Sequence, residues 1–232
     1  MCGRYSLTTA PEAMRRLFEF AGLPNLGPRY NIAPTQAAPV VRKTADGRRL
    51  DLLRWGLIPP WAKDRSIASR LINARAETVA EKPAFRAAFR HRRCLVPADG
   101  FYEWRTEQGR KQPFRIGLKG GGPFAFAGLW ESWTAPEGRG EDADAHLETF
   151  TILTTEANEK LRAIHPRMPV ILPGAAYEPW LDAAATPPEA ALAWLCPYPA
   201  EPMAFYRVST RVNNVRNDDP DCIAPLERAP EA

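Results

Sequence analysis

Proline interrupts this chain throughout, with 24 prolines among 232 residues. Its ring fixes φ and removes a backbone donor, so long helices and central strands rarely continue through it. Between the prolines lie short runs in which apolar and polar residues alternate, a pattern typical of half-buried strands. We therefore predict one compact α+β domain, with a curved, barrel-like, mostly antiparallel sheet and short flanking helices.

The expected strands are short, and several are expected to form hairpins. Residues 38–42 should pair with 48–57 across Asp46-Gly47, and 101–105 with 111–118 after a turn at Asp99-Gly100. Further strands are expected at 94–98, 124–133, 148–155 and 205–212.

Short helices are expected at the edges of this sheet. The first should cover 10–20, with Thr9 as N-cap, and another should run from Thr155 to Arg162. Two more are expected at 82–93 and 188–195. The polar stretch 136–146 is expected to be a mobile loop, the domain to span 1–224, and 225–232 to be a flexible tail.

The composition excludes several classes of function. No apolar run reaches the ~20 residues of a membrane-spanning helix, and no signal peptide is visible, so we expect a cytoplasmic, nucleoid-associated protein. Four dispersed cysteines without a CxxC pair, beside three histidines, make a zinc site unexpected. The chain also lacks a P-loop, a GxSxG and an HExxH motif, so no metal or cofactor is expected.

Charge is distributed unevenly along the chain. Residues 1–120 carry 23 Lys and Arg against 10 Asp and Glu, whereas residues 121–232 carry 8 against 17. Arginine, whose planar fork suits phosphate, accounts for 25 of the 31 basic residues. The pattern favours a basic surface for a polyanion, although an arginine-rich codon usage would produce the same count.

A cysteine directly follows the initiator methionine in the opening MCGRYS. Removal of that methionine would leave Cys2 with a thiol and a free α-amine on neighbouring carbons. Alternatively, Cys2 is an ordinary small buried residue at the start of a strand. The first six residues are compatible with both interpretations.

Other polar residues stand where the pattern calls for apolar ones. Glu103 lies among the aromatics of FYEW, where desolvation would raise its pKa toward that of a general acid–base catalyst. His165 is held beside Pro166, and histidine is the side chain whose unperturbed pKa, near 6.5, lies close to neutrality. A solvent-facing glutamate and a structural histidine are the alternatives.

Two further segments are candidates for binding. In LINARAET, an extended backbone would point Asn73, Arg75 and Glu77 to one face, unless they simply face solvent. Trp61, in the loop IPPWAKD, could stack on a nucleobase or fold back onto the core.

The order of the motifs MCGRY, RYNIAPTQ, WGLIPPWAKD, LINARAET, RCLVPADGFYEW, ILTTEAN and IHPRMPVIL resembles that of the SRAP family, the SOS-response-associated peptidases. The resemblance covers nearly the whole chain, from Cys2 to about residue 219. It implies a protein that shields abasic sites in single-stranded DNA by a covalent crosslink. The chemistry is consistent with this: a neutral α-amine can condense with the aldehyde of an open abasic site, and the thiol can then close a thiazolidine ring.

The resemblance also implies roles for individual residues. Glu103 would transfer protons, His165 would open the sugar ring, and Asn73 would hold the linked Cys2 and sugar. The residues implied in DNA binding are Arg4, Asn31, Pro34, Trp61, Arg75, Thr154 and Arg167. We expect a monomer acting on abasic single-stranded DNA without a metal.

Two other functions stay open at this point. The chain could be a thiol peptidase, including one limited to removing its own first residue, with Cys2 as nucleophile and His165 as base. It could also be a non-catalytic module that binds single-stranded DNA through arginines and Trp61. AP-lyase activity is compatible with the crosslinking chemistry.

Overall fold

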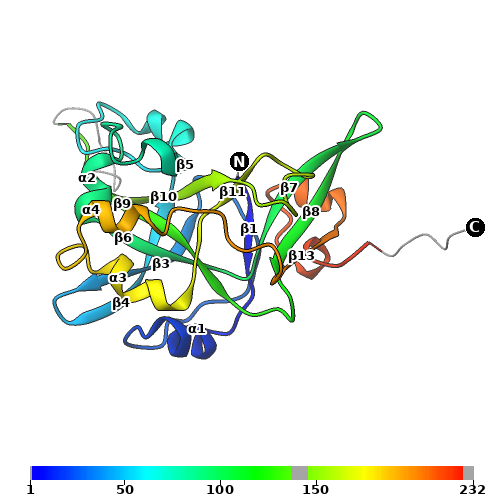
Figure 1. Cartoon of the computed structure of the whole chain (residues 1–232), viewed down its shortest axis with the longest axis horizontal. Coiled ribbons are helices and arrows are strands. Elements are labelled where there is room, and N and C mark those ends of the chain that lie inside the picture. The colour runs from blue at the N-terminus through cyan, green and yellow to red at the C-terminus, as the bar shows by residue number, and fades with distance from the viewer. Residues whose placement is uncertain (1, 137–145, 227–232) are drawn as a thin grey trace, which may run out of the picture.

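The computed structural model of this chain describes residues 2–136 and 146–226 (Figure 1). The described strands are β1 Tyr5–Leu7, β2 Arg29–Ile32, β3 Ala37–Thr44, β4 Gly47–Trp55, β5 Asn73–Arg75, β6 Arg93–Ala98, β7 Gly100–Glu107, β8 Arg110–Leu118, β9 Phe124–Thr134, β10 His146–Glu156, β11 Arg167–Pro169, β12 Ile171–Leu172 and β13 Met203–Arg207. The α-helices are α1 Pro11–Phe18, α2 Arg86–His91, α3 Tyr177–Leu181 and α4 Pro188–Leu192.

Five strands close into a barrel in the order β10, β4, β3, β6, β9 and back to β10. All neighbours are antiparallel except β4 and β10, which run parallel. On the two long edges of β10, β5 and β11 continue the sheet, and β12 pairs with β9. The expected barrel-like, mostly antiparallel sheet is confirmed.

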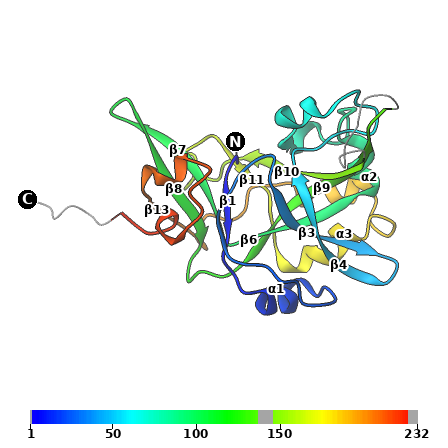
Figure 2. The same ribbon diagram turned by 180° about the vertical axis from the view of Figure 1, so that it is seen from behind.

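A second, antiparallel sheet stands beside the barrel in the order β13, β8, β7, β1, β2. Figures 1 and 2 show that β1 lies on the side of this sheet that is nearer to the barrel. Its Tyr5 contacts Trp55 and Phe126 of the barrel, with ring centroids 5.2 and 5.8 Å apart. The N-terminal segment is therefore part of the core and not an appendage, because aromatic packing holds it against the barrel.

The two expected hairpins form, and the turn of the first is displaced by one residue. β3 and β4 pair up to Thr44 and Gly47, so Ala45 and Asp46 make the turn. Gly100 is already in β7, which belongs to the second sheet, so Asp99 is a crossing between sheets and not a hairpin turn.

The first helix begins one residue later than predicted, and its N-cap is Ala10 and not Thr9. The amide and hydroxyl of Thr9 bond instead to the carboxylate of Asp99, at 3.0 and 3.2 Å. A tertiary acceptor therefore replaces the local capping bond. The helix ends at Phe18, and its C-cap Glu19 takes the left-handed conformation; Gly22 lies beyond the end of the helix, as predicted.

The helix predicted from Thr155 to Arg162 is wrong. Strand β10 continues to Glu156, and the following residues form turns in which the Asn158 side chain accepts from the Leu161 amide. Pairing of β10 with β11 outweighs the helix propensity of this segment. The strand predicted at 205–212 is also shorter, because β13 ends at Arg207 and a 3₁₀ turn covers Thr210–Asn213.

Most of the stretch predicted as a loop at 136–146, and of the tail predicted at 225–232, lies outside the described residues. At the described end of that tail, Pro225 bridges to Val208 and the Leu226 amide donates to the Arg207 carbonyl. Within the residues that the structure describes, no helix is long and apolar enough to cross a membrane.

Gly56 ends β4 in a backbone conformation with φ of 119°, which is costly for any residue with a side chain. A Cβ at this position would stand 2.8 Å from the Ala68 carbonyl oxygen. We expect Gly56→Ala to lower the free energy of unfolding by about 2–4 kcal/mol, measured by urea denaturation. Gly27→Ala is the control, since nothing lies within 4 Å of its added Cβ; equal stability of the two variants would contradict the prediction.

Candidate functional site

Cys2 lies in the hydrophobic core at the entrance to β1, with no exposed surface. The Arg4 carbonyl accepts from the Tyr102 amide at 2.9 Å, which continues the β1–β7 ladder toward Glu103. Burial raises the pKa of the Cys2 thiol, and the negative charge of Glu103 raises it further. At neutral pH the sulfur is therefore a thiol and not a thiolate.

Glu103 projects from β7 and is only 4 % exposed. Desolvation raises the pKa of this carboxyl, and the nearby His165 opposes the rise. Its Oε1 lies 4.0 Å from Nδ1 of His165, which is two residues before the start of β11. The buried carboxyl predicted from the FYEW pattern is confirmed, and it is close to groups that can exchange protons with it.

The His165 ring is positioned by the backbone of Arg167. Nδ1 lies 3.0 Å from the Arg167 amide nitrogen and 3.1 Å from its carbonyl oxygen. The amide can donate to Nδ1 when that nitrogen is unprotonated, and the carbonyl can accept when it is protonated. The backbone of Arg167 thus holds the ring in place whether or not Nδ1 carries the ring proton.

Asn73 comes from the other side of the site, on β5, whose residues pair with Ile152, Leu153 and Thr154 of β10. Its amide nitrogen donates to the Ile152 carbonyl at 3.4 Å. Its Oδ1 is buried and has no hydrogen-bond partner in the described part of the chain. An unsatisfied buried acceptor is costly, so Asn73 is prepared to accept a donor from a ligand.

A groove of about 380 Å³ opens beside Asn73. Trp61, 59 % exposed, and the cations Arg70, Arg75 and Lys82 line it. The loop that carries Trp61 is anchored, because Trp133 donates to the Ala62 carbonyl at 2.8 Å. Trp61 therefore does not fold back onto the core.

Arg167 and Thr154 form an ion-paired cluster at the edge of β10. The Arg167 guanidinium bonds to both carboxylate oxygens of Glu77, at 2.6 and 3.1 Å, and to the Thr154 carbonyl at 2.6 Å. This partner holds the pKa of Glu77 below its usual range. We predicted that Glu77 shares one strand face with Asn73 and Arg75. It does not, because Glu77 lies in a 3₁₀ turn after β5.

Arg4 and Asn31 are held by the protein itself. The Arg4 guanidinium donates to Asn31 Oδ1 at 2.8 Å and to the Val212 carbonyl at 2.6 Å. The Asn31 amide donates to the carbonyls of Val212, Asn214 and Asn217 at 2.6–3.2 Å. Pro34 is half-buried in the turn between β2 and β3.

Sequence reasoning did not single out Arg70 and Lys82 as groove residues, or the bond between Glu77 and Arg167. Both cations are exposed and, among the described residues, neither forms an ion pair. The sequence signal for Arg70 and Lys82 was only that each lies within ten positions of Trp61 or Asn73. Basic residues at such spacings are too common in this chain to identify these two. Over residues 2–136 and 146–226, no group of three His, Cys, Asp or Glu side chains could hold a metal ion.

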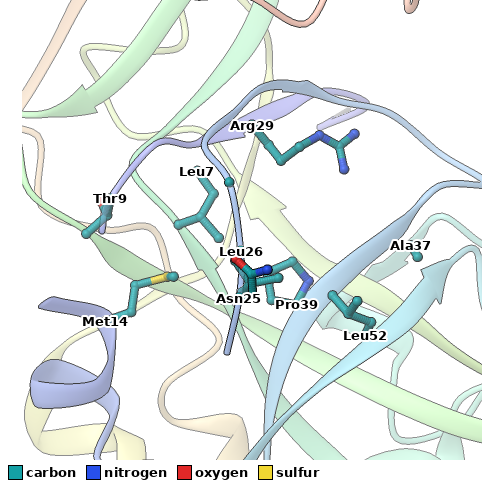
Figure 3. Close-up of a pocket in the computed structure, with 10 residues that line it drawn as sticks. Leu7, Thr9, Met14, Asn25, Leu26, Arg29, Ala37, Pro39 and Leu52 are labelled. Carbon is teal, nitrogen blue, oxygen red and sulfur yellow. The ribbon is translucent and has the colours of Figure 1, made fainter. Parts of the chain in front are cut away.

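A second cavity, of about 270 Å³, lies elsewhere, between α1, β1 and the β3–β4 hairpin (Figure 3). Its lining is mostly apolar, including Leu7, Met14 and Leu52, and none of the predicted site residues borders it. Its one charged residue, Arg29, is already paired with Asp218. This cavity offers no acid–base pair and is not the candidate site.

Fold and site together define a single-domain α+β protein in which an N-terminal cysteine is buried next to a glutamate and a histidine, near a cationic groove with an exposed tryptophan. The family model named SOS response associated peptidase (SRAP) matches residues 1–215. The chain belongs to this family.

Curated relatives extend the comparison. The chain is 44 % identical over 227 residues to the Abasic site processing protein YoqW of Bacillus subtilis, covering 96 % of this chain and 99 % of the relative. It is 34 % identical over 270 residues to the Abasic site processing protein HMCES of Gallus gallus, covering 98 % and 78 %. A crystal structure of a Bacteroides thetaiotaomicron protein matches with a TM-score of 0.84 at 27 % identity, covering 97 % of this chain and all of the other.

Proposed function

We propose that this protein processes abasic sites in single-stranded DNA by forming a covalent thiazolidine crosslink through Cys2. The observation that carries the proposal is the burial of Cys2 beside Glu103, which is itself 4.0 Å from His165. The names of the relatives YoqW and HMCES support the abasic-site part of the proposal. The cationic groove with Trp61 supports the single-strand part.

The reaction balances without an oxidant or a cofactor. Removal of Met1 frees the Cys2 α-amine, which attacks C1′ of the ring-opened sugar and forms a carbinolamine. Loss of one water gives the imine, and the Cys2 sulfur adds to the imine carbon while its proton passes to the nitrogen. The product is a five-membered thiazolidine, favoured because ring closure is intramolecular.

The site residues have distinct roles in this scheme. Glu103, whose pKa is raised by desolvation, protonates the leaving hydroxyl of the carbinolamine and then relays the thiol proton to the imine nitrogen. His165 protonates the ring oxygen of the sugar to expose the aldehyde. Asn73 accepts from a sugar hydroxyl with its buried Oδ1.

The raised pKa of the Cys2 thiol favours this order of events over peptidase chemistry. A cysteine peptidase needs a thiolate as its nucleophile. Here the amine attacks first, and the thiol is needed only once an imine stands next to it. An autocatalytic removal of Met1 is the remaining peptidase function compatible with the site.

Arg167 can serve DNA binding only by exchanging a partner. Its guanidinium is held by Glu77 and Thr154, so a phosphate would have to displace Glu77. Arg75, exposed and without an ion pair among the described residues, is the more accessible phosphate ligand. Arg4 and Asn31 would act by holding the 212–217 segment near the site.

Two measurements test the proposal. Mass spectrometry should find that the mature chain begins at Cys2. The protein, mixed with an oligonucleotide carrying an abasic site, should then give a heat-stable shifted band on a denaturing gel. A retained Met1, or salt-sensitive binding without such a band, would refute the crosslinking function and leave only a DNA-binding module.

Trp61 should contribute directly to DNA affinity. We expect Trp61→Ala to weaken binding of single-stranded DNA by about 5–100-fold, because stacking is worth ~1–3 kcal/mol per base. Leu52→Ala is the control, since Leu52 is 57 % exposed but borders the other cavity. Fluorescence anisotropy measures both, and equal affinity of the two variants would exclude stacking by Trp61.

A further inference from the structure

The hairpin of β7 and β8 extends away from the rest of the fold (Figures 1 and 2). Because side chains alternate along a strand, Phe101, Glu103, Arg105 and Glu107 share one face of β7. The same face is apolar and buried at Phe101, and it carries Glu103 at the site. Farther out it becomes polar and accessible.

The pairing of the strands shows what else this face presents. Glu103 is opposite Phe114 on β8, Glu107 is opposite Arg110, and Phe114 is in turn opposite Arg207 on β13. Directly opposed residues project to the same side. The outer part of the face therefore carries Arg105, Arg110 and Arg207 against the single carboxylate of Glu107.

A hollow of about 660 Å³ lies along this outer part. Glu107 pairs with both Arg105 and Arg207, whereas Arg110 and Lys111 are exposed and form no ion pair with any described residue. Arg105 also stacks on the ring of Phe114, 4.7 Å from its centroid. The hollow is thus lined by more cations than its own carboxylate can neutralise.

We propose that the outer end of the hairpin, around the hollow lined by Arg110, Lys111 and Arg207, is a second binding surface for DNA phosphates. This proposal rests on the proposed function, because the DNA strand bound at the site would be the one that extends to the hairpin surface. Glu103 and Glu107 are four positions apart on β7, or ~13 Å at ~3.3 Å per residue. That span matches about four nucleotides of a stacked strand at ~3.4 Å each.

The test compares DNA flanks of different length. Oligonucleotides carry a tetrahydrofuran abasic analogue, which has no aldehyde, with two or eight nucleotides on either side. Binding is followed by anisotropy over a NaCl titration. We expect Arg110→Gln/Lys111→Gln to weaken binding about 5–20-fold with a long flank on one side, and less than twofold with short flanks. Its salt slope should fall by about 1.4, or ~0.7 for each lost phosphate contact.

Two further variants make the result specific. Arg15→Gln/Arg16→Gln removes the same charge from the exposed surface of α1, far from the hairpin, and should show no dependence on flank length (Figure 1). Glu107→Gln frees Arg105 and Arg207 and should tighten binding of the long-flank DNA. Tighter binding by Glu107→Gln could not result from misfolding, so this variant also controls for loss of structure.

The surface is excluded if the Arg110/Lys111 variant binds long and short flanks as the wild type does, or loses affinity equally for both. It is also excluded if the wild type itself is insensitive to flank length. A wild type that fails to crosslink a natural abasic site, yet shows the flank dependence, would refute the proposed function and uphold the surface.

Discussion

Cys2→Ala is expected to abolish the heat-stable crosslink to abasic single-stranded DNA. The variant keeps an α-amine but has no thiol to close the ring, so any imine it forms hydrolyses when the protein is denatured. The measured band should fall to background, at least 100-fold below wild type. Cys2 is fully buried in the core, so the loss of one sulfur also requires a check of folding by circular dichroism.

Cys2→Ser separates the two functions of the residue. It retains the amine and a similar volume, but an oxygen analogue of the ring is less stable than a thiazolidine. We expect no heat-stable band, and a band restored by borohydride, which reduces an imine to a stable amine. Cys196→Ser is the matched control, because Cys196 is exposed and outside the site. A stable crosslink in Cys2→Ser without borohydride would refute ring closure through sulfur.

Glu103→Gln is expected to slow crosslink formation by about 10²–10⁴-fold, the usual contribution of a proton-transferring side chain. Glutamine keeps the shape of the carboxyl but cannot carry the proton. Single-turnover rates at saturating protein measure crosslink formation separately from DNA binding. We expect the affinity for DNA to change little. Glu131→Gln is the control, since Glu131 is also buried, with a pKa raised mainly by desolvation, but pairs with Arg92. Equal rates for Glu103→Gln and wild type would remove the proton-transfer role.

The same substitution should stabilise the protein at neutral pH. Burial raises the pKa of Glu103 above its unfolded value of about 4.3. Below that value the carboxyl is protonated in both states, and its stabilising contribution is complete. As the pH rises toward and through the folded pKa, the contribution is lost. The melting temperature of Glu103→Gln should therefore match wild type near pH 4 and exceed it increasingly toward pH 7; a constant difference would contradict the raised pKa.

These two predictions follow from one feature of the fold. β1 belongs to the second sheet and packs against the barrel, where Tyr5 contacts Trp55, so Cys2, three residues before Tyr5, lies in the interior. An ordinary N-terminus would be solvated and its thiol would titrate freely. Here desolvation keeps the sulfur protonated and raises the pKa of its neighbour Glu103.

Much of the secondary structure could be predicted because its causes are local. The alternation at 101–105 and 111–118 and the turn between them depend on residues close in sequence, and both strands form. The predictions failed where a distant partner intervened. Asp99 binds the Thr9 hydroxyl at the helix end, and pairing with β11 keeps Thr155 and Glu156 in strand β10 instead of a helix.

The candidate site divides in the same way. The sequence by itself determined that Glu103 is surrounded by aromatics and that a cysteine follows Met1, since these are facts about neighbours in the chain. Only the tertiary structure decided which side chains are engaged. Arg167 is bound to Glu77 and Arg4 to Asn31, whereas Asn73 keeps a buried oxygen without a partner in the described chain. Hydrogen bonds and desolvation act between residues that are far apart in sequence. The packing of the second sheet, which contains β1, against the barrel brings those residues together.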